Sequence, residues 1–165
     1  MILLGLGGNL PSKAGPPDAT ISAAIEALDL AGAKVTKRSR LYRTAPVPAS
    51  DQPWFANEVI AVKTRLPPRE LLALLHRVEA EFGRERKEVN GARTLDIDLL
   101  AYDGKVQVGG GGEPVLPHPR LTQRAFVLLP LREVAPRWRH PITGESVKRL
   151  IASLPKDQVA EPILD

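Results

Sequence analysis

Two aspartates, Asp96 and Asp98, stand in the pattern Asp-x-Asp within the stretch RTLDIDLL at residues 93–100. The alternation predicts a strand whose apolar residues face the core, with both aspartates on the opposite face. Their Cα atoms would lie about 6.5–7 Å apart, which is two strand rises. Adjacent carboxylates repel unless a cation lies between them, and Mg²⁺ is commonly held by one or two carboxylates together with substrate phosphates. The pattern indicates a metal site, while a solvated strand face is the alternative.

Basic residues surround this pair in the sequence. Arg84 and Arg86 precede the predicted strand in a loop, and Arg93 opens it. Further along, His118 stands between two prolines, and Arg124 follows shortly after. Guanidinium forks bind phosphate oxygens bidentately, so carboxylates and arginines this close together favour a metal–nucleotide site over an ordinary charged loop. Because no P-loop or complete dinucleotide fingerprint is present, side chains would have to hold the phosphates.

The scarce aromatic residues point to a second kind of ligand. Only seven occur (two Trp, two Tyr and three Phe), and Trp54 and Phe55 stand at a loop-to-strand junction. In an extended chain Phe55 and Asn57 share a face. A ring beside an amide suits a flat, hydrogen-bonding heterocycle, whereas core packing is the alternative for Phe55.

The elements that must position these residues follow from apolar periodicity. Strands are predicted at residues 1–6, 34–43, 54–64 and 95–102, and helices at 18–31, with Asp18 as N-cap, and at 68–82. Asp103-Gly104 is a hairpin signal. This βαββαβ order predicts a ferredoxin-like α+β sheet with helices packed on it. Residues 124–134, despite Pro130, and 147–154 predict a C-terminal helical extension.

Composition limits the class of protein. A chain of 165 residues with a net charge of +4 and no cysteine fits a single domain over residues 1–165, without disulfides or cysteine-based metal sites. The longest uncharged run, residues 1–12, is broken by glycines and is too short for a membrane helix. We therefore expect a cytoplasmic, monomeric protein, with no membrane and no nucleic acid as partner.

Several stretches taken together resemble one family, the 6-hydroxymethyl-7,8-dihydropterin pyrophosphokinases of folate synthesis. They occur in family order and span residues 6–130, which is most of the chain: LGGNL at 6–10, YRT at 42–44, DQPWFAN at 51–57, Gly83-Arg84 with Arg86, RTLDID at 93–98, and PHPR at 117–120 continuing to Phe126. The family fold is ferredoxin-like α+β, as the order of elements predicts.

The resemblance implies a reaction in which ATP donates pyrophosphate to the hydroxymethyl group of the dihydropterin and leaves as AMP. It assigns Asp96 and Asp98 to two Mg²⁺ ions, and Arg84 and Arg93 to catalysis. The remaining assignments fall into two groups, one for the pterin and one for the nucleotide or its phosphates. The first group is Thr44, Val47, Phe55, Asn57 and Phe126; the second is His76, Glu79, Arg84, Arg86, Arg93, His118 and Arg124.

The sequence departs from the family pattern at three places, and two alternative functions remain. Asn90-Gly91-Ala92 stands where the family often has Trp-Gly-Pro, Gly8 where serine is common, and Ala45 where proline is common. The residues leave two ways of activating the attacking hydroxyl: by a metal ion, or by Asp98 acting briefly as the proton acceptor. The first alternative function is a ferredoxin-like nucleic-acid-binding module, which the two aspartates disfavour because they repel phosphate. The second is a metal-dependent phosphohydrolase.

Overall fold

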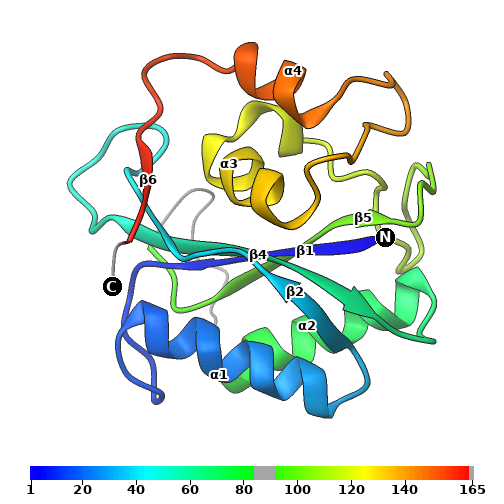
Figure 1. Ribbon diagram of the computed structural model, residues 1–165. Coiled ribbons are helices and arrows are strands. Elements are labelled where there is room, and N and C mark those ends of the chain that lie inside the picture. Colours follow the sequence, from blue (N-terminus) through cyan, green and yellow to red (C-terminus); the bar gives the residue numbers. More distant parts are fainter. Residues whose placement is uncertain (84–91, 164–165) are drawn as a thin grey trace.

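The computed structural model describes residues 1–83 and 92–163 (Figure 1). Arg84 and Arg86 lie outside these described residues. The strands are β1 (Ile2–Gly8), β2 (Lys34–Arg38), β3 (Tyr42–Thr44), β4 (Phe55–Lys63), β5 (Asp96–Tyr102) and β6 (Ala160–Pro162). The helices are α1 (Pro17–Leu30), α2 (Pro68–Glu81), a 3₁₀ turn η1 (Leu121–Gln123), α3 (Ala125–Val134) and α4 (Val147–Ala152).

Within the described residues the strands form one antiparallel sheet. Its order is β5-β1-β4-β3-β6, and β2 pairs with β4 beside β3. β1 and β2 are both antiparallel to β4, which therefore lies between two parallel strands joined by α1. This is the split β-α-β arrangement, and it confirms the predicted ferredoxin-like α+β fold.

Both faces of the sheet are covered. In Figure 1 the sheet is seen nearly edge-on, with α1 and α2 on one side and α3 and α4 on the other. Strand alternation sends Leu4 and Leu6 of β1 into the core under α1 and α2, while Leu3 enters the core under α3. Leu95, Ile97 and Leu99 join the first core, as the sequence predicts. The two aspartates of β5 therefore face the α3 side.

The structure differs from several of the predicted strand and helix boundaries. Residues 34–43 form two strands rather than one, because the main chain is interrupted at Ser39, whose hydroxyl accepts a hydrogen bond from the Val59 N–H at 3.0 Å. Pro16, not Asp18, is the N-cap of α1, and Asp18 lies in the first turn. A bulge at Leu100 also shifts the register between β1 and β5.

The C-terminal part differs as well. Asp103-Gly104 does form a tight turn, with the Lys105 N–H donating to the Tyr102 carbonyl at 2.9 Å, yet no described strand returns along β5. The last helix ends at Ala152, two residues before the predicted end. β6, a three-residue strand beside β3, was not predicted, since so short a segment carries no periodicity.

The end of β1 crosses the chain that leads into β5 at very close range. A Cβ atom on Gly8 would lie 2.4 Å from the Thr94 carbonyl oxygen, which belongs to the backbone and has little freedom to move. We predict that Gly8→Ala lowers the free energy of unfolding by about 1–3 kcal/mol, measured by urea denaturation.

Gly5→Ala is the matched control, because a Cβ on Gly5 would meet the Leu100 side chain at 3.4 Å, an ordinary contact that a flexible side chain can relieve. Equal losses for the two variants would show that the Gly8–Thr94 contact is not the cause.

Candidate active site

A cavity of about 260 Å³ opens on the α3 side of the sheet. It exists because β1 contributes glycines to that face: Gly5 and Gly7 alternate with Leu4 and Leu6, which are buried in the opposite core. The lining residues come from β1, β3, β4, β5, α3 and the adjoining loops: Gly5, Leu6, Gly7, Thr44, Ala45, Val47, Pro48, Phe55, Asn57, Glu58, Arg93, Asp96, Asp98, Arg120, Gln123, Arg124, Phe126 and Val127.

Strand register places an amide and a carboxylate on opposite sides of one glycine. Gly7 pairs with Asn57 of β4 on one side and with Asp96 of β5 on the other, and Gly5 pairs with Asp98. The Cα atoms of Asn57 and Asp96 are thus two strand spacings apart, about 9.6 Å. The cavity floor has an amide end and an acidic end.

Cations compensate the acidic end. Arg93 Nη1 donates to Asp96 Oδ2 at 3.0 Å, while Arg124 Nη1 lies 3.6 Å from Asp98 Oδ2. The two aspartate side chains are 25% and 27% exposed, so both carboxylates remain reachable from the cavity. Burial is the largest cause lowering the pKa of Arg124, and Asp98 opposes it.

A neutral histidine borders the same carboxylate. His118 Nε2 lies 3.8 Å from Asp98 Oδ1, and Nδ1 accepts the Arg120 N–H at 3.1 Å. Burial, together with nearby Arg124, lowers the pKa of His118 to about 4. The imidazole is therefore neutral at physiological pH, and since Nδ1 is an acceptor, Nε2 carries the proton and faces the acidic end.

A buried hydrogen bond fixes the amide end. Asn57 Nδ2 donates to Thr44 Oγ1 at 2.6 Å, and both residues are buried. This contact settles the orientation of the amide and leaves its Oδ1 toward Gly7, where a Cβ atom would lie only 2.4 Å away. Phe55 from β4 and Phe126 from α3 line the same cavity, and the Arg124 guanidinium lies 5.2 Å from the Phe126 ring centroid.

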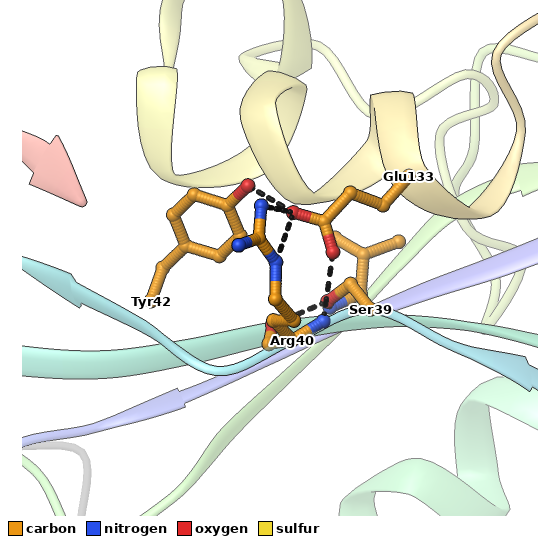
Figure 2. Close-up of polar contacts among 5 residues, drawn as sticks. Ser39, Arg40, Tyr42 and Glu133 are labelled. Atoms are coloured by element: carbon orange, nitrogen blue, oxygen red, sulfur yellow. Dashed lines mark hydrogen bonds and ion pairs between the residues drawn. The ribbon is translucent and has the colours of Figure 1, made fainter. Parts of the chain in front are cut away.

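One carboxylate anchors α3, the helix that carries Phe126, to the strands. Figure 2 shows the Glu133 side chain reaching from α3 to both Arg40 and Tyr42. Glu133 Oε1 accepts the Arg40 backbone N–H at 2.9 Å; Oε2 accepts from Arg40 Nε at 3.2 Å and Nη2 at 3.0 Å, and from the Tyr42 hydroxyl. Burial, followed by the Glu133 contact, raises the pKa of Tyr42 to about 12.

The structure brings together most of the residues that the sequence assigned to the site. Nine line the cavity, and His118 contacts Asp98 from beside it: the nine are Thr44, Val47, Phe55, Asn57, Arg93, Asp96, Asp98, Arg124 and Phe126. Their individual roles remain predictions.

Two assigned residues lie elsewhere. Glu79 is buried on α2, and its Oε2 accepts the Ile97 N–H at 2.8 Å on the opposite side of the sheet from the cavity. His76 is exposed on the same helix. Neither lines the cavity, because α2 covers the face toward which Ile97 points, so a nucleotide role for them stays a prediction.

The sequence did not assign Arg120, Gln123, Gly5 or Gly7 to the site, although all four line the cavity. Arg120 stands two residues after His118 in the basic stretch PHPR, so its residue type was a usable signal. The glycines gave one too, since Gly5 and Gly7 are two residues apart on an apolar strand and must share a face.

The fold and site define a class: a ferredoxin-like α+β domain whose sheet presents two carboxylates, close to several arginines, in a cavity that two phenylalanines also line. A family model, 7,8-dihydro-6-hydroxymethylpterin-pyrophosphokinase (HPPK), matches residues 3–136. The chain belongs to this family. Its activity is pyrophosphoryl transfer to hydroxymethyldihydropterin in folate synthesis, and the family uses ATP. The sequence-based prediction of family and reaction is confirmed.

Comparisons with individual relatives support the same family assignment. A 2-amino-4-hydroxy-6-hydroxymethyldihydropteridine pyrophosphokinase of Methylorubrum extorquens is 43% identical over 152 residues, covering 92% of this chain and 91% of the relative. A Synechocystis protein of the same name is 39% identical, covering 90% and 73%. The fold resembles a Plasmodium falciparum HPPK-DHPS crystal structure with a TM-score of 0.70 at 15% identity, over 92% of this chain and 43% of that longer one. None of the described helices has the length and apolar character that a bilayer crossing requires.

The Glu133 anchor makes a pH-dependent contribution to stability. Burial alone would raise the pKa of Glu133, but hydrogen bonds from Arg40 and Tyr42 outweigh it and hold that pKa below its ordinary value. A depressed folded-state pKa stabilises the fold above the unfolded value of about 4.3 and loses this effect as pH falls through the folded value. We predict that Glu133→Gln lowers the free energy of unfolding by about 1–2 kcal/mol at pH 7.

The deficit should shrink below about pH 4, measured by urea denaturation at several pH values. Glu26→Gln, on the exposed face of α1, is the control and should show no such trend. A Glu133→Gln deficit that stays constant from pH 7 to pH 3 would contradict this assignment.

Proposed function

We propose that the cavity binds both substrates at once and that the pyrophosphoryl group is transferred above Gly7. The observation that carries the proposal is the row Asn57–Gly7–Asp96, in which one side-chain-free position lies between an amide residue and a carboxylate residue whose Cα atoms are about 9.6 Å apart. A bicyclic ring at the amide end extends its hydroxymethyl group toward the acidic end, where the phosphates lie.

The amide end is the proposed pterin site. Phe55 and Phe126 supply rings for stacking on the two faces of the heterocycle, and the backbone between Thr44 and Val47 supplies edge contacts. The hydrogen bond from Asn57 to Thr44 supports this role, because it fixes which amide atom faces the cavity before any ligand arrives. A preoriented amide distinguishes donor from acceptor positions along a pterin edge.

The acidic end is the proposed site of the triphosphate. Arg93 and Arg124 are the described cations nearest the carboxylates, Arg120 lines the same cavity, and His118 offers an N–H. We extend this set to Arg84 and Arg86, whose structure lies outside the described residues. Phosphoryl-type transfer depends mainly on positioning and charge stabilisation, so these cations would offset charge on the transferred group and on departing AMP.

The donor set fits Mg²⁺. Asp96 and Asp98 present hard oxygen ligands on one strand face, and no third carboxylate or histidine joins them in a three-membered cluster within the described residues. A site with two protein carboxylates leaves the remaining coordination positions to phosphates and water, which is how Mg²⁺ is usually held in such enzymes. We propose two ions here; when bound, they neutralise phosphate charge and acidify the attacking hydroxyl.

The two cores support a single domain over residues 1–165, since both pack against the same sheet. We propose that this domain acts as a monomer, and we place it in the cytoplasm, where its co-substrate ATP is available.

The metal assignment predicts that Asp96→Asn and Asp98→Asn each reduce turnover by at least about 100-fold, because the isosteric amides keep the shape and lose the charge. The measurement is AMP formation from ATP, Mg²⁺ and 6-hydroxymethyl-7,8-dihydropterin, with EDTA abolishing the wild-type reaction. Asp103→Asn is the matched control: this exposed aspartate lies in a turn at φ 49°, a conformation that asparagine tolerates.

Retained turnover in Asp96→Asn or Asp98→Asn would refute the metal site. Release of inorganic phosphate from ATP without pterin would favour a phosphohydrolase instead.

The stacking assignment predicts a selective effect of Phe126→Ala. Loss of one ring should weaken dihydropterin binding about tenfold, while ATP binding measured in the same preparation by calorimetry changes little. A comparable loss for both ligands would argue that Phe126 shapes the whole helix end and does not stack on the pterin.

A further inference from the structure

The segment at residues 158–162 lies beyond the family match, which ends at residue 136, yet it contacts both walls of the cavity. On one side β6 pairs with β3, where Ala160 is opposite Thr44, and the Ala45 N–H donates to the Val159 carbonyl at 3.0 Å. Thr44 and Ala45 line the amide end. Figure 1 shows β6, in red, beside β3 after the chain descends from α4.

On the other side the Gln158 side chain makes two hydrogen bonds at the start of α3, which we call the Gln158 clasp. Its Oε1 accepts the Ala125 N–H at 2.8 Å, and its Nε2 donates to the Gln123 carbonyl at 2.7 Å. These two groups flank Arg124, the N-cap of α3, whose backbone is extended at φ −119° and ψ 111°. The N–H groups of a first helical turn have no partner within the helix, so an amide side chain that accepts from one and donates across the cap fixes this turn.

Among the described residues, the Arg124 guanidinium makes only loose contacts with its surroundings. Its Nη1 lies 3.6 Å from Asp98 Oδ2, which is longer than a good hydrogen bond, and the guanidinium lies 5.2 Å from the Phe126 ring centroid. The backbone on each side of Arg124 is what aims the guanidinium over the acidic end. The same clasp sets where Phe126, one residue after Ala125, enters the amide end.

We propose that Gln158 is a positioning residue for pyrophosphoryl transfer: through its two hydrogen bonds it orients Arg124 toward the phosphates and Phe126 toward the pterin. β6 fixes Gln158 relative to β3, so the segment sets the distance between the two walls. The inference rests on the proposed roles of Arg124 and Phe126.

The fold does not depend on this clasp. The body of α3 is held by Leu128 and Leu131 in the second core and by Glu133 on Arg40 and Tyr42, whereas Gln158 is only half-buried. Removing the Gln158 amide should therefore loosen the first turn of α3 and leave the helix in place.

The test compares Gln158→Leu and Gln158→Glu with wild type in steady-state assays and in separate calorimetric titrations of ATP and dihydropterin. Gln158→Leu loses both hydrogen bonds, so kcat/KM should fall about tenfold and both ligands should bind more weakly, with little change in Tm. Gln158→Glu keeps the acceptor at the helix N-terminus, where a carboxylate is favourable, and should recover part of the loss. Gln107→Leu is the control, since its Nε2 donates to the Pro114 carbonyl at 2.7 Å in a loop away from the cavity.

Repeating the Gln158→Leu substitution in an Arg124→Ala variant separates a positioning role from general stabilisation. If Gln158 acts through Arg124, then Gln158→Leu should weaken ATP binding in wild type but add little in an Arg124→Ala background. Additive losses, a kcat/KM within twofold of wild type, or a loss equal to that of Gln107→Leu would overturn the proposal. If Gln158→Leu does not fold, Gln158→Glu decides: wild-type kinetics would refute the clasp, and a partial loss in kcat/KM that disappears in the Arg124→Ala background would support it.

The two levels of inference fail separately. If Arg124→Ala and Phe126→Ala leave both affinities unchanged, the assignment of the cavity is wrong. If those variants lose affinity while Gln158→Leu does not, only the positioning role is wrong.

Discussion

The site depends on a single buried amide, that of Asn9, at the point where β1 ends. Its Oδ1 accepts the Arg93 N–H at 2.9 Å, and its Nδ2 donates to Gln52 Oε1 and to the Pro53 carbonyl, each at 2.9 Å. The Asn9 and Leu10 N–H groups both donate to the Arg93 carbonyl. Three segments are thereby tied together: the end of β1, the approach to β4 and the approach to β5. These are the strands that carry the cavity floor, the amide and the carboxylates, so their relative register is fixed within one cluster of hydrogen bonds.

This constraint also explains the glycines around Asn9. The chain before β5 can approach only because Gly8 has no side chain, and the row beside it stays open only because Gly7 has none. Close backbone packing thus produces both the stability of the crossing and the space above the sheet. The opposite wall is of another kind: α3 is a separate element tied to the strands by Glu133 near one end and by Gln158 at the other. A rigid floor of strands faces a wall whose position depends on a few polar contacts.

What the sequence could predict follows from periodicity. The alternation in β5 identified the carboxylate face, because a strand buried on one face leaves no choice for Asp96 and Asp98. The predicted order of strands and helices also rests on periodicity, and that order identified the fold. The bulge at Leu100, the break at Ser39 and the three-residue β6 arise from pairing between distant segments, and no local pattern encodes them. The helical spacing of His76 and Glu79 told which residues share a face of α2, but not that this face lies across the sheet from the cavity.

The need for tethers on α3 can be traced to one residue. Pro130 lies inside the helix and has no N–H, so the Phe126 carbonyl, four residues earlier, lacks its helical donor. The first turn is consequently joined to the rest of α3 by fewer backbone hydrogen bonds than an ordinary turn. The apolar residues further along hold only the body of the helix in the second core. A first turn that carries Phe126 and is capped by Arg124 must therefore take its order from outside the helix, and Gln158 supplies both an acceptor and a donor at that position.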